Sequence, residues 1–267
     1  MKIISLNMYG GIVFEPLMQF IEKHSDADVF CLQEAIFAKE EGIPLESNGA
    51  RTNLVQEIAK RLPDHDFKFA PMQDGFDTVE AGELPIAFGL VTFWKKSMNV
   101  ESKQDFFVYK DLNTLKGQDY STLGSNAVIV TFDVNGEKLS ILNTHGMSEP
   151  ADKLDSPARI SQSGNILNGL EDIGHAKIIM GDFNLYPDTE SIQLFERAGY
   201  RNLIKEFDIK DTRGSMNKKL HPEYEHGKYG FQPYADYTFV TDDVQVKQFD
   251  VPDEPISDHL PMILEIK

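Results

Sequence analysis

The sequence predicts an α+β protein in which packed β-sheets are flanked by helices. Short apolar runs that are rich in β-branched and aromatic residues recur along the chain. Gly, Asp, Asn or Pro bounds them, as is typical of buried strands. Strand-like runs cluster in residues 66–145 with no helical pattern between them. Because strands and helices do not alternate strictly, we expect sheets that pack on each other rather than one doubly wound sheet.

Several strands and helices follow from these patterns in chain order. The apolar runs predict strands at residues 3–6, 29–32, 127–132, 139–142, 177–180, 237–240 and 262–266. The last run alternates, so one of its faces should be buried. Apolar residues at helical spacing predict helices around residues 17–21, 54–62, 160–170 and 192–198.

Three segments are predicted to be long loops, namely Ala35–Ser47, Gln73–Pro85 and Lys205–Ala235. Loops longer than about 12–15 residues are usually functional or disordered. The third loop combines aromatic and basic side chains and ends immediately before Asp236. A solvated excursion with anchoring aromatics would explain it, but we favour a substrate-facing rim.

Length and composition place the chain among ordinary globular proteins. No Pro/Gly/Ser-rich linker divides it, so we expect residues 1–267 to form a single domain. A hydrophobic content of 41% and a charged content of 26% exclude disordered, collagen-like and disulfide-scaffold proteins. The 43 acidic residues outnumber the 26 basic ones. The net charge of −17 argues against indiscriminate binding to nucleic acid or anionic membranes, because that binding relies on Lys and Arg.

One cysteine and the polar start of the chain bear on its compartment. Cys31 cannot form an internal disulfide, and its apolar neighbours predict a buried thiol rather than a reactive one. No run approaches the ~18 apolar residues that a transmembrane helix needs. The apolar run within residues 1–7 is too short for a signal peptide, because polar residues follow it almost at once. We therefore expect a cytoplasmic protein that is most simply a monomer.

Polar residues of catalytic type stand at the ends of nearly all predicted strands. Singly, each also fits turn or strand-end chemistry, because Asp and Asn favour turns. Together they predict one common mouth, since side chains that project from one end of a sheet converge. Carboxylates and carboxamides there would bind a hard divalent cation through oxygen. The segments are Asn7, Gln33-Glu34, Asn143-Thr144-His145, Asp182-Phe183-Asn184, Asp236 and Ser257-Asp258-His259.

In this order, the segments make the sequence similar to the endonuclease/exonuclease/phosphatase superfamily. That group includes type I deoxyribonuclease, abasic-site endonucleases, inositol-polyphosphate 5-phosphatases, neutral sphingomyelinases and deadenylases. Arg159 and Gln162 resemble the branch with deadenylases and sphingomyelinases more than the abasic-site branch. Gly146 departs from the Leu that many relatives carry there. The resemblance implies a four-layer α/β/β/α sandwich with two face-to-face β-sheets, the fold of type I deoxyribonuclease.

The resemblance also implies metal-assisted hydrolysis of a phosphate ester. Glu34 matches the family's metal-binding glutamate, Asn7 would help to hold the metal or the phosphate, and Asp258 would be a further metal-side carboxylate. Mg²⁺ is the expected ion, with Mn²⁺ as a substitute, because Mg²⁺ prefers a few carboxylates plus waters and phosphate oxygens.

The catalytic roles are likewise carried over from the resemblance. Asp182 would orient and deprotonate the attacking water, His259 would hydrogen-bond the phosphate and that water, and Asp236 would orient His259 and favour its charged form. His145 would assist the leaving group as the acid. The residues expected to bind the substrate phosphate are Asn143, His145, Arg159 and Asn184.

The substrate is less well determined than the reaction. A phosphodiesterase or phosphatase acting on a small phosphorylated metabolite or nucleotide suits the net charge of −17. Nuclease activity on DNA or RNA is an alternative, although a duplex-tracking surface should be basic and no basic patch is evident. Sphingomyelinase-like hydrolysis of a phospholipid head group is another. A non-catalytic interaction module is the remote alternative, because such a module would have lost motif residues that are all present here.

Overall fold

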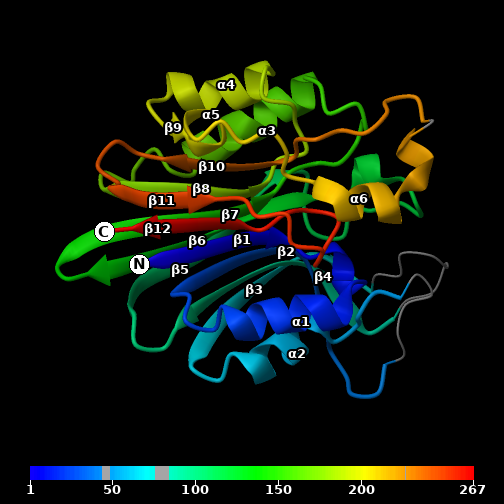
Figure 1. Ribbon diagram of the computed structural model, residues 1–267, viewed down its shortest axis with the longest axis horizontal. Coiled ribbons are helices and arrows are strands. Elements are labelled where there is room, and N and C mark those ends of the chain that lie inside the picture. Colours follow the sequence, from blue (N-terminus) through cyan, green and yellow to red (C-terminus); the bar gives the residue numbers. More distant parts are fainter. Residues whose placement is uncertain (44–48, 76–83, 226) are drawn as a thin grey trace.

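The structure is a computed structural model that describes residues 1–43, 49–75, 84–225 and 227–267. Two six-stranded mixed sheets lie face to face, with helices on their outer sides (Figure 1). The predicted four-layer α/β/β/α sandwich is therefore confirmed. The first sheet has the order β11-β12-β1-β2-β4-β3 and the second has the order β5-β6-β7-β8-β10-β9.

The strands include every run that the sequence predicted. In the first sheet they are β1 Lys2–Asn7, β2 Val29–Ala38, β3 His65–Asp74, β4 Ile86–Lys95, β11 Val246–Asp250 and β12 Met262–Ile266. In the second they are β5 Asn99–Tyr109, β6 Ser125–Val134, β7 Glu137–His145, β8 Ala176–Asp182, β9 Arg201–Asn202 and β10 Asp236–Val240. The alternation of the last strand is confirmed, because its first, third and fifth residues are buried and the others are half-buried.

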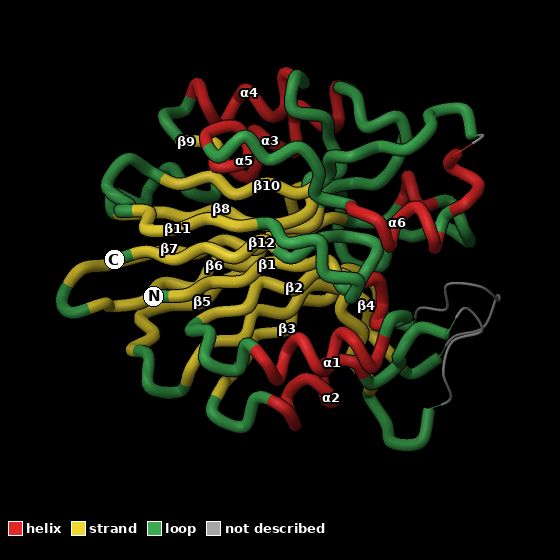
Figure 2. Tube along the Cα trace, in the orientation of Figure 1, coloured by secondary structure: helices red, strands yellow, loops and turns green. Residues whose placement is uncertain are grey.

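Helices cover the outer face of each sheet (Figure 2). Helix α1 (Phe14–Lys23) and α2 (Leu54–Arg61) pack on the first sheet through buried apolar stripes. Helix α3 (Pro157–Asn168), α4 (Glu190–Arg197) and α5 (Leu203–Glu206) cover the second. Among the described residues, no helix has the length and apolar character needed to cross a membrane. The 3₁₀ turns are η1 Tyr9–Gly11, η2 Tyr120–Thr122 and η3 Pro222–Glu225.

The main core lies between the two sheets and joins them. Trp94 of β4 packs edge-on against Phe132 of β6, with ring centroids 6.5 Å apart. Cys31 is fully buried in this core, as predicted, and burial raises the pKa of its thiol. Fully burying one large apolar side chain contributes about 1.5–3 kcal/mol. Because many such side chains from both sheets are buried here, the core between the sheets holds them in a fixed relative position.

The long-loop predictions need correction. Residues 35–38 belong to β2 and residues 73–74 to β3, because both strands extend beyond their apolar runs. The segment 205–235 was predicted as one loop, but it contains helix α6 (Gly214–Leu220) and η3. Helix α6 escaped the sequence pattern because it has no apolar stripe, and its buried residues are Gly214 and Asn217. Residues 44–48, 76–83 and 226, which belong to these three segments, lie outside the described residues.

Strand register brings the polar strand ends to one edge of the sandwich. Asn7 lies opposite Gln33 in the parallel pair β1–β2, and His145 lies opposite Asp182 in the parallel pair β7–β8. Asp236 begins β10 opposite Asp182, because that pair is antiparallel. The carboxyl ends of β1, β7 and β8, the middle of β2 and the start of β10 thus meet where α6 covers the end of the sandwich (Figure 1).

Candidate active site

A pocket of about 370 Å³ opens at this edge and is lined by residues from both sheets. Six residues that the sequence predicted for the site line it, namely Glu34, His145, Asp182, Asn184, Asp258 and His259. The predicted convergence of distant strand ends is therefore what the structure shows for these six residues.

Glu34 reaches the pocket through a bulge in β2. In a regular strand successive side chains face opposite sides, so Gln33 and Glu34 would diverge. The pairing with β4 shifts between Leu32 and Ala35, and Glu34 has a positive φ of 52°. Gln33 points between the sheets, while the bulge turns the Glu34 carboxylate to the pocket. A bulge with a strained residue at a sheet edge commonly re-aims a functional side chain.

Asn7 joins carboxylates from the two sheets. Its Nδ2 donates to Glu34 Oε1 at 3.0 Å and to Asp182 Oδ2 at 2.9 Å. Its Oδ1 accepts from the Tyr9 backbone N at 3.0 Å. The Nδ2 end of this buried amide thus holds the two acids side by side, and the Oδ1 end fixes the orientation of the amide.

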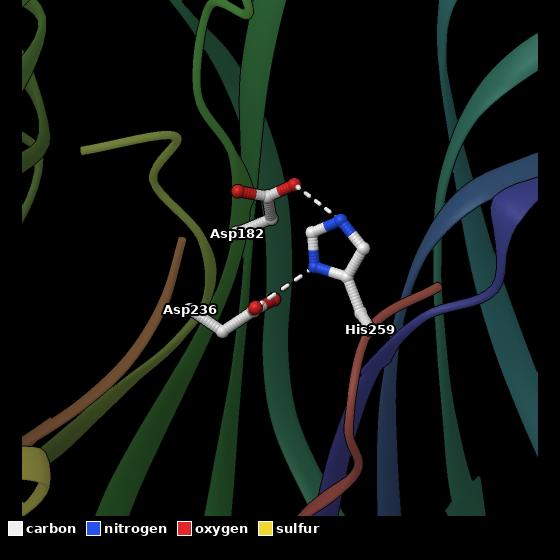
Figure 3. A group of neighbouring side chains, drawn as sticks. All are labelled: Asp182, Asp236 and His259. Carbon is white, nitrogen blue, oxygen red and sulfur yellow. Dashed lines mark hydrogen bonds and ion pairs between the residues drawn. The ribbon is translucent and has the colours of Figure 1, made fainter. Parts of the chain in front are cut away.

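Asp182, His259 and Asp236 form a chain of acid, imidazole and acid (Figure 3). His259 Nδ1 lies 2.8 Å from Asp236 Oδ2, and His259 Nε2 lies 3.7 Å from Asp182 Oδ2. Burial lowers the pKa of His259, but the surrounding carboxylates outweigh burial and raise it to about 9. Burial likewise raises the pKa of Asp182, yet the two histidines and Lys153 reverse this and leave it below its usual value. An imidazolium between carboxylates is the resulting state at neutral pH.

His145 faces the same carboxylates from the end of β7. Its Nε2 lies 3.6 Å from Asp182 Oδ2 and 4.0 Å from Glu34 Oε1. The close approach of β7 and β8 requires glycine at 181, because a Cβ there would lie 2.0 Å from the Thr144 carbonyl oxygen. The Gly of the Gly-Asp-Phe-Asn segment therefore sets the spacing between His145 and Asp182.

Asp258 is surrounded by donors from the segment around α6. Its Oδ2 accepts from Arg213 Nη2 at 2.9 Å and from Asn217 Nδ2 at 3.2 Å, and His221 Nε2 lies 3.4 Å away. Burial raises the pKa of Asp258, but the neighbouring His259, His221 and Arg213 outweigh it and hold this pKa far below the usual range. Asp258 therefore already has positively charged partners within the protein. This argues against the metal-binding role predicted for it.

Asn184 and Lys153 complete the wall of the pocket. The Asn184 backbone N donates to Asp182 Oδ1 at 2.8 Å, and its Nδ2 donates to the Gly146 carbonyl at 3.3 Å. Its Oδ1 accepts from Lys153 Nζ at 2.5 Å. Lys153 was missed because a lysine eight positions after His145, among acidic residues, has no pattern that marks it. Arg213 and Asn217 also have no pattern that marks them. Together with His221, they lie in the segment 205–235, which the sequence predicted to be a substrate-facing rim.

Two residues predicted to bind phosphate lie outside the pocket. Asn143 Oδ1 accepts from Gln33 Nε2 at 2.7 Å, and its Nδ2 lies 3.2 Å from the Val91 carbonyl oxygen, so Asn143 joins the sheets. It shares a face with His145 but lies about 6–7 Å deeper along the strand. The fully buried Arg159 donates instead to backbone carbonyls of the segment 147–155. We therefore replace both predicted contacts with structural roles.

The donor set at the pocket fits a hard divalent cation. Burial raises the pKa of Glu34, and among the described residues this carboxylate has no ion pair with a lysine or arginine. A half-buried carboxylate without such a partner is unfavourable, and a cation beside Glu34 and Asp182 would supply the missing charge. The group Asp182, Asp236 and His259 also brings three ligand atoms within 4.8 Å, but His259 Nδ1 is engaged by Asp236.

Comparisons with known proteins agree with this geometry. The Endonuclease/Exonuclease/phosphatase family pattern matches residues 4–259, whereas a search of curated protein sequences gave no significant match. A family protein from Leptotrichia buccalis is 18% identical with a TM-score of 0.70, and the alignment covers 100% of this chain and 99% of that one. The mannosyl-6-phosphatase of Bacteroides thetaiotaomicron is 16% identical with a TM-score of 0.69 and the same coverages.

The human Nocturnin catalytic domain, solved with bound sulfate, is 17% identical with a TM-score of 0.67, covering 100% of this chain and 93% of that one. At such identities these likenesses show a shared fold. The family pattern spans nearly the whole chain and includes every strand end that lines the pocket. By that match, this chain is a member of the endonuclease/exonuclease/phosphatase family.

Proposed function

We propose that the protein is a Mg²⁺-dependent hydrolase of phosphate esters, with a small phosphorylated molecule as its substrate. The observation that carries this proposal is the placement of Glu34, Asp182 and His259 around one pocket, with Asn7 and Asp236 bonded to them. Family members are generally hydrolytic, and the similar structures include one described as a phosphatase.

Asp182 is the residue we assign to the attacking water. Its Oδ1 and Oδ2 are fixed by the Asn184 backbone N and by Asn7, so the carboxylate has one orientation. The water oxygen forms a bond to phosphorus as the bond from phosphorus to the leaving oxygen breaks. Asp182 takes the proton of the water, and His145 supplies a proton to the leaving oxygen.

His259 stabilises the charge that builds on the phosphate. The raised pKa of about 9 keeps its ring protonated at neutral pH, so Nε2 can donate to a non-bridging oxygen. Asp236 holds the other nitrogen and keeps the ring in place. Asn184 is the further phosphate contact that we retain from the sequence, since it lines the pocket.

Glu34 would hold the metal, with Asn7 keeping Glu34 and Asp182 together and Mn²⁺ as a workable substitute for Mg²⁺. When bound, the metal neutralises phosphate charge and makes a coordinated water more acidic. Asp258 takes a different role in our proposal. Because Arg213, Asn217 and His221 already occupy it, it would stabilise the His259 cation from the second side.

The size of the pocket and the net charge of the protein favour a small substrate. A pocket of about 370 Å³ lies at the small end of the range for small-molecule sites. The net charge of −17 does not favour the binding of a polyanion such as nucleic acid. Hydrolysis of nucleic acid or of a phospholipid head group remains an alternative that the following experiment can reveal.

The test measures hydrolysis of p-nitrophenyl phosphate and bis-p-nitrophenyl phosphate with Mg²⁺, with Mn²⁺ and with EDTA. We expect turnover with either metal, none with EDTA, and a loss of about 10³-fold or more in Asp182→Asn, which should keep the wild-type circular dichroism. Single-stranded DNA, RNA, nucleotides and sphingomyelin are then compared. Turnover that EDTA leaves unchanged, or full activity in Asp182→Asn, would contradict the proposal.

A further inference from the structure

We propose that Lys153 binds the terminal oxygens of the substrate phosphate and makes the site prefer phosphate monoesters to diesters. This inference rests on the phosphoesterase function proposed above. It adds a specificity residue from a loop, outside the strand-end segments that carry the family resemblance. Of that set, Lys153 hydrogen-bonds Asn184 through its ammonium group.

The ammonium of Lys153 lies in the pocket with donors to spare. Lys153 is 4% exposed and lines the pocket, and its Nζ donates to Asn184 Oδ1 at 2.5 Å. A lysine ammonium carries three donors. That amide oxygen uses one of them, and the described residues offer Nζ no other hydrogen-bond partner. Two N–H groups of Lys153 are left for a ligand.

Lys153 differs from the other cationic groups of the pocket in its partners. His145 and His259 each lie within 4.0 Å of a carboxylate, and Arg213 and His221 both lie close to Asp258. Within the described part of the chain, Lys153 has no carboxylate oxygen within 4.0 Å. Among the described cationic groups that line this pocket, Lys153 is therefore the one without a carboxylate oxygen within ion-pair distance.

Burying an ammonium without a counter-charge is costly. Burial lowers the pKa of Lys153 to about 7, although the more distant Asp182 and Asp236 act in the opposite direction. A bound phosphate would supply the counter-charge and the hydrogen-bond acceptors that the ammonium lacks. This is the reason to read Lys153 as a ligand-binding group rather than as a structural one.

The segment that carries Lys153 is built to hold it in place. Arg159 donates to the carbonyls of Pro150 at 2.6 Å and Leu154 at 2.8 Å, on both sides of Lys153. The Lys153 carbonyl accepts from the Tyr186 backbone N at 2.9 Å. Lys153 itself has a positive φ of 56°, a strained conformation for a lysine that surrounding contacts must maintain.

A fixed extra cation distinguishes monoesters from diesters through charge. A phosphate monoester loses its second proton with a pKa near 6, so at neutral pH it carries close to two negative charges, whereas a diester carries one. The monoester also has one more terminal oxygen to accept from Nζ. Lys153 should therefore contribute more to binding and turnover of monoesters than of diesters.

The experiment compares Lys153→Met with wild type. We expect kcat/KM for p-nitrophenyl phosphate to fall about 10- to 100-fold, the effect of losing a hydrogen bond to a charged group. For bis-p-nitrophenyl phosphate we expect a clearly smaller loss. Titration of metal-free protein with inorganic phosphate, followed by calorimetry, should show weaker binding in Lys153→Met. Lys96→Met, immediately after β4 and away from the pocket, is the control and should change neither.

Two further measurements keep the outcome decisive. Lys153→Arg retains the charge and should recover part of the monoester activity. If thermal unfolding shows that Lys153→Met does not fold, the polar but uncharged Lys153→Gln takes its place. Equal losses on both esters, or unchanged rates and phosphate binding, would overturn the inference. A wild type that hydrolyses neither ester would instead refute the proposed function, and the phosphate titration alone would then decide the role of Lys153.

Discussion

The strand-end side of the pocket and its loop side are built in different ways. On the strand-end side, Asn7, His145, Asp182 and Asp236 are placed by β-sheet register, and a bulge adds Glu34. On the loop side, Lys153 and Arg213 are placed by side-chain contacts to irregular segments. The difference suggests that the strand-end side, with His259 held against it by Asp236, performs the reaction and that the loop side selects the substrate, since loops can vary without disturbing the sheets.

The largest effect should come from the centre of the strand-end side. Asp182→Asn keeps the shape but removes the base, so we expect kcat to fall by about 10³-fold or more for monoesters and diesters alike. Steady-state rates on both p-nitrophenyl esters measure this. Unequal losses on the two esters would show that the strand-end side also selects the substrate.

Removing the metal carboxylate should act through metal affinity. Glu34→Gln leaves the bulge and the Asn7 contact sterically intact, and we expect Mn²⁺ affinity to fall more than about tenfold. Calorimetric titration of Mn²⁺ reports this without any turnover. The matched control is Glu137→Gln, an exposed residue at the far end of β7, which should bind Mn²⁺ as wild type does.

The third prediction concerns Arg159, which holds the segment 147–155 on the loop side in place. Arg159→Met removes a fully buried guanidinium that donates to the carbonyls of Pro150 and Leu154 and pairs with Asp152, so we expect the free energy of unfolding to fall by about 2–4 kcal/mol. Monoester hydrolysis should fall more than diester hydrolysis, because Lys153 loses its fixed position. Urea unfolding and the two esters measure these effects. Arg197→Met, at an exposed ion pair, is the control and should cost less than about 1 kcal/mol.

The last prediction concerns the pH dependence of stability. The pKa of His259 is about 9 in the folded protein against 6.5 for an ordinary histidine, so its protonation stabilises the fold fully below pH 6.5. That contribution is lost as pH rises through about 9. In Asp236→Asn the pKa of His259 should drop, because its hydrogen-bonded counter-charge is gone. Urea unfolding at several pH values should show a smaller loss on the alkaline side than in wild type.

The same division explains how much the sequence could predict. The strand-end residues were found because each follows or precedes an apolar run, and the parallel pairs β1–β2 and β7–β8 carry them to one edge. The sequence analysis placed Asn143 in the pocket, because a run of apolar residues does not show how far along a strand the second sheet covers it. In the structure Asn143 lies between the sheets. Arg159 shows the same limit, since nothing in its sequence context reveals the carbonyls that occupy its guanidinium.

The loop side could not be predicted for a physical reason. Lys153 lies in the pocket only because Arg159 and the Tyr186 backbone hold its segment, contacts that have no periodic signature. Glycine at 146 has a similarly non-periodic cause, because a Cβ there would lie 2.7 Å from the Phe183 carbonyl oxygen. A cytoplasmic, monomeric protein stays a prediction from the sequence.

The most direct test of the central claim follows the oxygen of the attacking water. The protein is incubated with a phosphate monoester and Mg²⁺ in ¹⁸O-labelled water, and the products are analysed by ³¹P NMR and mass spectrometry. If Asp182 directs water to phosphorus, one ¹⁸O atom appears in inorganic phosphate and none in the alcohol, and Asp182→Asn forms no labelled phosphate above background. Label in the alcohol, or labelled phosphate formed equally fast by Asp182→Asn, would contradict the account.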